Sequence, residues 1–380
     1  MKKIQDANIN NKKVLVRIDT DILNDDGQIQ NDSRLKASLP TIKYLLSHQA
    51  TVTLCGHIDR PKGKVIEKLR MKPVEGRLVK LIGNHNNWKV LENLRFDPGE
   101  EENSSEFAKK LAEGQEIFIE DAFATCHRAH ASTEGVAKIL PSYAGLSVQK
   151  EIENLEKLID SKEKPFTVIL GGAKIADKLP VIKNLMSKAD NFLIGGAIAN
   201  TFLAARRHHM GKSRMETEAF REANIIWQNL MDETQRNLYL PEDLVLSLSA
   251  KAAEDVQEIN VEQLLEPDFA FRHADYFAVD IGPQTVKTFQ RVLKDSKKIF
   301  WNGNMGVSEV KEFANGTENI AQALSESDAQ IVIGGGDTVA AFESLNLKPK
   351  PNIFLSTGGG ATLEFLAGKQ LPGLKVLDYY

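Results

Sequence analysis

Glycine-rich segments that follow runs of strand-forming residues are the clearest chemical signal in the second half of the chain. Glycines between a parallel strand and a helix let a ligand approach the backbone, and they expose the N–H groups of the helix start to anions. Ligands of open α/β sheets bind at the carboxyl ends of the strands. Several such junctions in one lobe therefore predict a polyphosphate site, with tight turns and no ligand as the alternative. The segments are Gly171-Gly172-Ala173-Lys174, Gly195-Gly196, Gly334-Gly335-Gly336-Asp337-Thr338 and Ser356-Thr357-Gly358-Gly359-Gly360.

Charged side chains accompany two of these segments. Lys174 and Lys178 stand four residues apart, and on a helix they would share one face and suit a row of phosphates. A solvated face with Asp177 as the partner is the alternative. Asp337 follows three glycines, where a carboxylate can meet a Mg²⁺ ion held on phosphates or can cap a helix. The pattern favours a nucleotide with its metal.

Arginines recur at expected strand ends and turns in the first half of the chain. Their guanidinium groups match the geometry of phosphate and carboxylate. Any single one is more typical of a surface ion pair, but their recurrence predicts a basic anion pocket. They are Arg17, Arg34, Arg60, Arg95 and Arg128, with His57 close to Arg60.

Two common nucleotide motifs are missing from the sequence. The pattern G-x-x-x-x-G-K-[ST] is not found, so the usual P-loop NTPase is excluded. No G-x-G-x-x-G follows the first expected strand, so a dinucleotide dehydrogenase is unsupported.

These residues have to be positioned by strands that alternate with helices, which is the pattern of an α/β protein with parallel sheets. We expect strands over 14–18, 50–55, 116–119 and 166–170, and a helix over 33–48. Residues 147–163 contain neither glycine nor proline and carry one apolar stripe, so we expect a single helix joining two lobes.

Composition narrows the class of protein further. The 380 residues carry a net charge of −4, which argues against a general nucleic-acid binder. The polar start argues against a signal peptide, and no apolar run is long enough for a membrane helix. Cys55 and Cys126 form no metal-binding spacing and fit a reducing compartment. We therefore expect a soluble cytoplasmic protein.

Taken in order along the chain, these segments resemble those of the phosphoglycerate kinase family over essentially the whole length. One such segment is modest evidence, whereas the full set in the family's order and spacing is very specific. The matching segments are Arg17-Ile-Asp-Thr-Asp21, His57-Ile-Asp-Arg60-Pro61, Leu91-Glu-Asn-Leu-Arg95-Phe96, Asp121-Ala-Phe123, His127-Arg-Ala-His130, Gly171-Gly-Ala-Lys174-Ile-Ala-Asp-Lys178, Trp301-Asn-Gly303, Gly334-Gly-Gly-Asp337-Thr338 and Ser356-Thr-Gly-Gly-Gly360.

The resemblance implies two Rossmann-like parallel-sheet lobes joined by a helix, with a C-terminal tail returning to the first lobe. It assigns residues 1–146 and the tail 364–380 to a phosphoglycerate-binding lobe. Residues 147–163 form the joining helix and 164–363 the nucleotide-binding lobe. It also implies that the lobes close on 3-phosphoglycerate or 1,3-bisphosphoglycerate and on MgADP or MgATP, and that the enzyme is a monomer without nucleic-acid or membrane partners.

The resemblance further implies a role for individual residues. Around the transferring phosphoryl group it places Arg34, Lys174, Gly358 and Gly359. For the phosphoglycerate it implies Asp19, Asp21, Arg34, His57, Arg60, Arg95 and Arg128. For the nucleotide it implies Gly171, Lys178, Gly195, Val279, Asn302, Val307, Glu309, Gly336, Asp337 and Thr338, with Asp337 also serving Mg²⁺.

The sequence departs from the family's usual pattern at several positions. Asp21 replaces an asparagine that contacts phosphoglycerate, and Asp59 replaces a glycine, so two negative charges are added where an anion should bind. We expect weaker substrate binding unless a neighbouring arginine offsets them. The remaining departures are Thr20 in the first lobe and Ala197, Asn200, Asn304 and Ser308 around the expected adenine pocket.

Two further hypotheses stay open beside an active phosphoglycerate kinase. One is a relative with impaired turnover that acts as a binding or regulatory protein. The other is a kinase for a different carboxylate acceptor, which rests on Asp21 and Asp59. Retention of the charged residues Arg34, Lys174, Lys178, Asp337 and Glu309 favours the active kinase.

Overall fold

The computed structural model describes residues 1–29, 31–83, 87–231, 237–345 and 349–380. The chain forms two compact units. Unit 1 contains Met1–Glu153, Gly360–Phe365 and Lys369–Tyr380, and unit 2 contains Asn154–Gly359 and Leu366–Gly368. The helix α5 (Leu146–Asp160) runs through the division between them, between Glu153 and Asn154.

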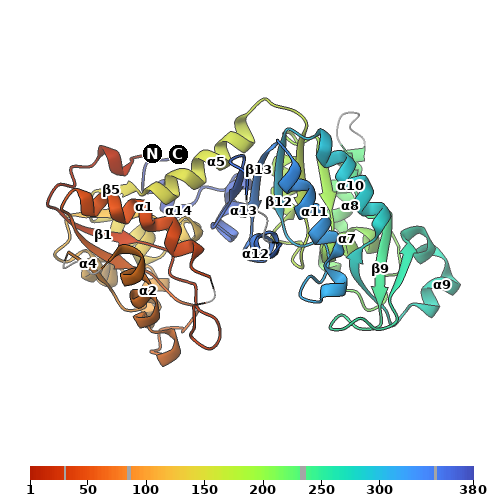
Figure 1. The fold of residues 1–380 in the computed structure, drawn as a ribbon, viewed down its shortest axis with the longest axis horizontal. Coiled ribbons are helices and arrows are strands. Elements are labelled where there is room, and N and C mark those ends of the chain that lie inside the picture. The colour runs from red at the N-terminus through yellow and green to blue at the C-terminus, as the bar shows by residue number, and fades with distance from the viewer. Residues whose placement is uncertain (30, 84–86, 232–236, 346–348) are drawn as a thin grey trace. The chain divides into compact units, whose positions relative to one another are not determined.

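Unit 1 is built on a five-stranded parallel sheet with the strand order β3-β2-β1-β4-β5, flanked by helices (Figure 1). The strands are β1 (Lys13–Arg17), β2 (Thr51–Cys55), β3 (Trp88–Val90), β4 (Ile117–Glu120) and β5 (Ser142–Ala144). The helices are α1 (Ser33–Ser47), α2 (Lys72–Ile82), α3 (Pro98–Glu101), α4 (Ser105–Ala112), α14 (Pro372–Lys375) and the start of α13 (Gly360–Leu366).

Alternation along β1 explains the layers of unit 1. Side chains on a strand point to opposite faces in turn. Val14 and Val16 are completely buried and pack with residues of α1 and α2, whereas Leu15 packs on the other face with α4. The C-terminal segment closes on the same unit, because Lys2 N–H donates to the Leu377 carbonyl at 2.9 Å.

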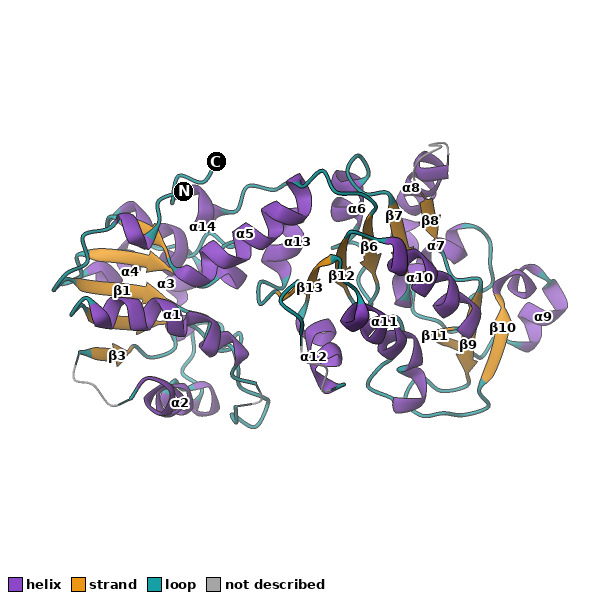
Figure 2. Cartoon of the chain, turned by 45° about the horizontal axis from the view of Figure 1, so that its top comes forward, coloured by secondary structure: helices purple, strands orange, loops and turns teal. Residues whose placement is uncertain are grey.

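Unit 2 contains a six-stranded parallel sheet with the strand order β14-β13-β12-β6-β7-β8 and a smaller antiparallel sheet with the order β10-β9-β11 (Figure 2). The parallel strands are β6 (Phe166–Leu170), β7 (Asn191–Ile194), β8 (Asn237–Tyr239), β12 (Lys298–Asn302), β13 (Gln330–Gly334) and β14 (Ile353–Leu355). The antiparallel strands are β9 (Asp243–Ser247), β10 (Gln257–Asn260) and β11 (Phe277–Ile281). The helices are α6 (Leu179–Leu185), α7 (Gly196–Ala205), α8 (Phe220–Met231), α9 (Pro267–Arg272), α10 (Pro283–Asp295), α11 (Asn315–Glu326) and α12 (Gly336–Ser344).

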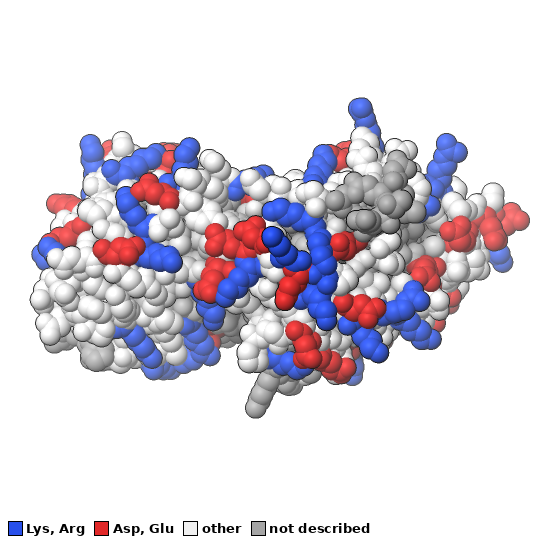
Figure 3. All heavy atoms as spheres, turned by 90° about the horizontal axis from the view of Figure 1, so that it is seen from above, with Lys and Arg blue, Asp and Glu red and all other residues white. Residues whose placement is uncertain are grey.

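The predicted α/β class with parallel sheets is confirmed. Within the described residues, no helix is long and apolar enough to cross a bilayer. On the face seen in Figure 3, Lys and Arg side chains lie among Asp and Glu side chains on both units. That face therefore carries charges of both signs.

Glu120, the last residue of β4, gives the stability of the fold a testable pH dependence. It is fully buried, and burial raises the pKa of its carboxyl to about 8, against the opposing effect of Arg17. An acid with a higher pKa in the folded state binds its proton more tightly there. This contribution to stability is therefore complete below the unfolded pKa near 4.5 and is lost as the pH rises through about 8.

We expect the free energy of unfolding to fall between about pH 5 and about pH 8, and Glu120→Gln to flatten that fall. The flattening is partial, because burial also raises the pKa of Asp121 to about 8. Urea unfolding at a series of pH values measures both slopes. Glu106→Gln, at an exposed position of α4, should keep the wild-type slope; an unchanged slope in Glu120→Gln would contradict the assignment.

Candidate active site

The residues predicted to bind an anion gather at one edge of the sheet in unit 1. Arg17 ends β1, His57 follows β2, Arg95 follows β3 and Arg128 follows β4. Because these strands are parallel, their carboxyl ends lie at the same edge. Arg34 belongs to the first turn of α1. We call Arg17, Arg34, His57, Arg60, Arg95 and Arg128 the cationic cluster.

Hydrogen bonds tie together the loops that carry this cluster. Arg34 Nη1 donates to the Asp21 carbonyl at 3.0 Å and lies 3.4 Å from Asp19 Oδ2. Asp21 Oδ1 accepts the backbone N–H of Asp59 at 2.9 Å. Arg95 Nη1 donates to the Asp59 carbonyl at 2.6 Å. The unusual Asp21 therefore joins two loops through an oxygen that an asparagine would also provide.

The buried guanidinium of Arg95 has more hydrogen-bond donors than the described residues supply acceptors for. It is only 2% exposed, and its Nε and Nη2 atoms form no hydrogen bond within the described part of the chain, although Glu101 Oε1 lies 3.3 Å from Nε. Burial, and then the charge of Arg128, lowers the pKa of Arg95 to about 10. Buried donors without acceptors are costly, so an anion placed here would be stabilised.

The other titratable groups of the cluster respond to the same crowding. Burial and the charge of Arg60 lower the pKa of Arg128. Burial, followed by the charges of Arg17, Arg95 and Arg128, lowers the pKa of His57 well below its ordinary value, so its ring is neutral. For Asp19, burial raises the pKa of the carboxyl, and the charge of Arg34 opposes this.

Two residues that the sequence analysis did not select contact the cluster. Ser132 Oγ accepts a hydrogen bond from Arg17 Nε at 2.9 Å and donates to Glu100 Oε1 at 2.6 Å. Ser132 lies two residues after the predicted segment His127–His130, and this proximity could have pointed to it. Glu100 gave none, since a glutamate in an acidic run is typical of a solvated helix and this one is completely buried.

The glycine-rich loops of unit 2 lie side by side, because they follow the neighbouring strands β13, β12, β6 and β7. Some of these glycines are required because the loops lie too close together for a side chain. A Cβ on Gly303 would lie 2.2 Å from the Gly171 carbonyl oxygen, and one on Gly171 would lie 2.2 Å from the Asn304 carbonyl oxygen. At Gly336 and Gly359, in contrast, a Cβ would meet nothing within 4 Å. These two glycines therefore mark where the backbone faces open space.

Predicted nucleotide-binding residues meet at the start of α12. Asn302 Nδ2 donates to the Gly334 carbonyl at 2.8 Å, and Gly303 N–H donates to Thr338 Oγ1 at 2.7 Å. Asp337 is exposed in the first turn of this helix, where free N–H groups favour anions. Asn302, Asp337 and Thr338 are thus brought together.

The prediction that Lys174 and Lys178 share a helix face is wrong. Helix α6 begins only at Leu179, and the preceding segment is a loop. Glu216, which the sequence analysis did not select, holds this loop by accepting the N–H groups of Ile175 and Ala176, both at 3.3 Å. The two glycines Gly171 and Gly172, together with the contact from the Glu216 carboxylate, favour a loop here and delay the start of the helix.

The two lysines differ in their surroundings. Lys174 is exposed, whereas Lys178 is buried. Burial lowers the pKa of Lys178, and the carboxylates of Asp177, Glu216 and Asp337 oppose the shift. Lys178 therefore lies within electrostatic reach of the start of α12, as a phosphate-binding lysine should.

The remaining predicted residues lie on β11 and after β12. Val307 N–H donates to the Val279 carbonyl at 2.8 Å, which places the two valines next to each other. Val279 is buried in β11, and Glu309 is exposed two residues after Val307. A Cβ on Gly195 would lie 2.5 Å from Met305 Sδ, so this glycine packs against the loop after β12.

Most of the departures from the family pattern form internal hydrogen bonds. Thr20 Oγ1 donates to the His57 carbonyl at 2.7 Å. Asn304 Nδ2 donates to Ser308 Oγ, so these two departures are paired with each other. Asn200 Nδ2 donates to the Arg214 carbonyl at 3.2 Å. Ala197 lies in the first turn of α7, and its carbonyl accepts the hydroxyl of Thr201.

In the part of the chain that the structure describes, Asp337 is the predicted metal-binding residue. The described residues contain no group of three or more His, Cys, Asp or Glu side chains arranged to hold an ion. Mg²⁺ keeps waters and phosphate oxygens and takes one or two carboxylates from a protein. The exposed carboxylate of Asp337, beside the open backbone at Gly336, fits an ion that arrives on a nucleotide.

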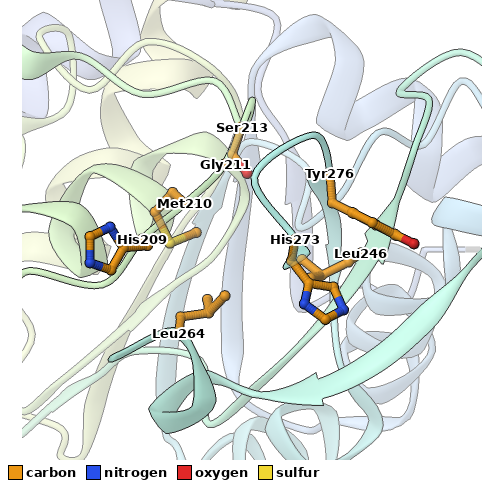
Figure 4. Close-up of a pocket in the computed structure, with 8 residues that line it drawn as sticks. All are labelled: His209, Met210, Gly211, Ser213, Leu246, Leu264, His273 and Tyr276. Atoms are coloured by element: carbon orange, nitrogen blue, oxygen red, sulfur yellow. The ribbon is translucent and has the colours of Figure 1, made fainter. Parts of the chain in front are cut away.

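A small hollow, too tight for a water molecule, lies elsewhere in unit 2, against the small antiparallel sheet (Figure 4). Its lining is mostly apolar and the predicted nucleotide-binding residues are not part of it. It is lined by His209, Met210, Gly211, Ser213, Leu246, Leu264, His273 and Tyr276.

A parallel-sheet unit with crowded arginines, joined in one chain to a parallel-sheet unit with glycine-rich loops, defines a class of enzyme that handles phosphorylated substrates. A sequence profile of the phosphoglycerate kinase family matches residues 4–369. The chain belongs to this family.

Curated relatives and solved structures agree with the profile. The phosphoglycerate kinase of Moorella thermoacetica is 42% identical and that of Pelotomaculum thermopropionicum 41%, with coverage of 98% and 99% of this chain and 98% of each relative. The phosphoglycerate kinase structure from Coxiella burnetii has a TM-score of 0.85 and 34% identity, over 99% of this chain and 98% of that one. The structure from Pyrococcus horikoshii has a TM-score of 0.84 and 31% identity, over 100% and 98%. The class is thus a phosphotransferase with a carboxyl group as acceptor.

Proposed function

We propose that the chain catalyses the reversible glycolytic transfer of a phosphoryl group between 1,3-bisphosphoglycerate and MgADP, giving 3-phosphoglycerate and MgATP. Membership of the family supports this reaction. The observation that carries it is Arg95 of the cationic cluster, whose buried Nε and Nη2 atoms form no hydrogen bond among the described residues. Such a cluster suits a small ligand with both a carboxylate and a phosphate.

Unit 1 is proposed to hold the phosphoglycerate. Arg60, Arg95, Arg128 and His57 donate to its anionic oxygens, and Asp19 and Asp21 position the loops around them. Asp19 also orients Arg34, whose Nη1 lies 3.4 Å from Asp19 Oδ2. Arg34 is proposed to neutralise charge on the transferring phosphoryl group.

Unit 2 is proposed to hold the nucleotide. Lys178, Asn302 and Thr338 serve the phosphates, Glu309 serves the ribose, and Gly171, Gly195, Val279 and Val307 line the base site. Lys174, Gly358 and Gly359 are assigned to the phosphoryl group, which the open backbone at Gly359 permits. Asp337 is proposed to bind the Mg²⁺ of the nucleotide, which supplies further charge neutralisation.

The chemistry requires positioning and charge neutralisation more than proton transfer. Phosphoryl transfer leaves little covalent work for a protein. The nucleophile in the ATP-forming direction is a phosphate oxygen of ADP that is already anionic, so no general base is needed. Small-molecule substrates of this kind also fit a monomeric enzyme of the cytoplasm.

A coupled assay tests the proposed function directly. Formation of 1,3-bisphosphoglycerate from 3-phosphoglycerate and MgATP is measured for the wild-type chain and for Lys174→Ala. Turnover of about 1–10³ s⁻¹, a usual range for enzymes, that is lost in Lys174→Ala supports the proposal. Absence of turnover while calorimetry still detects MgADP binding would contradict it, and would favour a binding protein or another acceptor.

The variant Asp21→Asn tests whether the negative charge of the Asp21 carboxylate weakens substrate binding. The asparagine keeps an oxygen for the Asp59 N–H, and it removes one negative charge beside the cationic cluster. We expect the KM for 3-phosphoglycerate to fall about fivefold, as for the loss of a partly screened like charge. Steady-state kinetics measures it. Asp26→Asn, in an exposed turn of unit 1, is the matched control and should leave the KM unchanged; a higher KM in Asp21→Asn would contradict the prediction.

A further inference from the structure

A buried chain of hydrogen bonds leads from Glu100 to His57 in unit 1. Glu100 Oε1 and Oε2 accept the hydroxyl and the N–H of Ser132 at 2.6 and 3.0 Å. Ser132 Oγ accepts Arg17 Nε–H at 2.9 Å, and Arg17 Nη2 lies 2.7 Å from His57 Nδ1. Glu100, Ser132 and Arg17 are fully buried and His57 is 5% exposed. Water therefore has little access to these hydrogen bonds.

The chemistry of the partners fixes the direction of every bond in this chain. A guanidinium group has only donors, and a carboxylate has only acceptors. The single hydroxyl proton of Ser132 goes to Glu100, which leaves its oxygen free to accept from Arg17. Because Arg17 must donate to His57, Nδ1 of the imidazole is the acceptor. The proton of the neutral ring therefore lies on Nε2.

Hydrogen bonds from several of its nitrogens fix the orientation of the Arg17 side chain. Its Nη1 donates to the Ile18 carbonyl at 2.7 Å, so each of its three nitrogens has a partner. Glu100 reaches the guanidinium through the Ser132 hydroxyl. Loss of one member of this network would leave buried polar groups unpaired, which is costly away from water.

We propose that Glu100 and Ser132 are positioning residues for the acidic substrate: through Arg17 they hold His57 as the Nε2–H tautomer, which donates to an anionic oxygen. The proposal rests on the proposed function, because it takes that anion to be the phosphoglycerate. With the other tautomer, Nε2 would present a lone pair to the anion, so that one hydrogen bond would be replaced by repulsion.

Nitrogen NMR of the full-length protein with ¹⁵N-labelled histidine tests the tautomer without any substrate. His57→Gln identifies the His57 signals. We expect a protonated Nε2 and an unprotonated Nδ1 in the wild type, and a mixture of tautomers in Ser132→Ala and in the isosteric Glu100→Gln. Ser142→Ala, which removes a buried serine of β5, is the matched control and should keep the wild-type signals. A wild-type His57 protonated at Nδ1, or an unchanged tautomer in both folded variants, would overturn the proposal.

Steady-state kinetics supplies a second readout that a merely structural role would not move. In Ser132→Ala the KM for 3-phosphoglycerate should rise about tenfold, the effect of one hydrogen bond to a charged group, while the KM for MgATP stays unchanged. Ser132→Thr keeps the hydroxyl and should restore the value. An equal rise in both KM values would overturn the proposal. A wild-type chain without turnover refutes the proposed function, but the NMR result still decides the tautomer.

Discussion

Replacing Arg34 by alanine is expected to lower kcat by about 10³- to 10⁵-fold, the range for an arginine that stabilises a transferring phosphoryl group. Arg34 is suited to this role because its guanidinium is only half-buried and is held from one side by Asp19 and the Asp21 carbonyl. Its remaining donors are therefore oriented before a substrate binds. Such preorganisation is what makes an electrostatic contribution large.

The test combines kinetics with a measure of folding. Arg34→Lys keeps the charge but loses the fork of donors, so its kcat should also fall, and by less. Arg70→Ala is the matched control, since Arg70 binds Glu67 and Glu92 and is not a member of the cationic cluster, so kcat should stay unchanged. Thermal unfolding shows whether each variant is folded. A folded Arg34→Ala variant with a kcat within tenfold of the wild type would refute the assignment.

Gly303→Ala is expected to destabilise unit 2 by about 3 kcal/mol or more, through backbone strain and overpacking together. Gly303 has a φ of +97°, and its added Cβ would lie 2.2 Å from the Gly171 carbonyl oxygen. Neither backbone segment can turn away as a flexible side chain could. Because these loops also carry Asn302 and Lys178, the affinity for MgADP should fall with the stability.

Two glycine variants separate stability from binding. Gly76 lies in α2 with nothing within 4 Å of its added Cβ, so Gly76→Ala should keep or raise the stability by up to about 1 kcal/mol. Gly336→Ala, where a Cβ also meets open space, should keep the stability and weaken MgADP binding. Urea unfolding and calorimetry measure the two effects. Equal stability of Gly303→Ala and the wild type would contradict the argument from loop packing.

Local patterns were sufficient to predict much of the fold. A short run of apolar residues predicted the buried strand that the structure has as β1, and an apolar stripe at helical spacing predicted a helix over 33–48 that the structure ends at Ser47. Periodicity is a short-range property, since it reflects which side of one element must be buried. The same reasoning failed at Lys174 and Lys178, because a contact from Glu216, some 40 residues later in the chain, holds that segment as a loop.

By itself, the sequence determined the family, the α/β class and the residue types available for an anion and a nucleotide, because motif order and hydrophobic periodicity are written along the chain. Only the tertiary structure decided which glycines serve loop packing and which face open space, since that depends on the neighbouring loop. It alone joined Glu100 and Ser132 to Arg17, which lies 115 residues before Ser132. The tautomer of His57 follows from these contacts, because a hydrogen bond is determined by the atoms that meet in space.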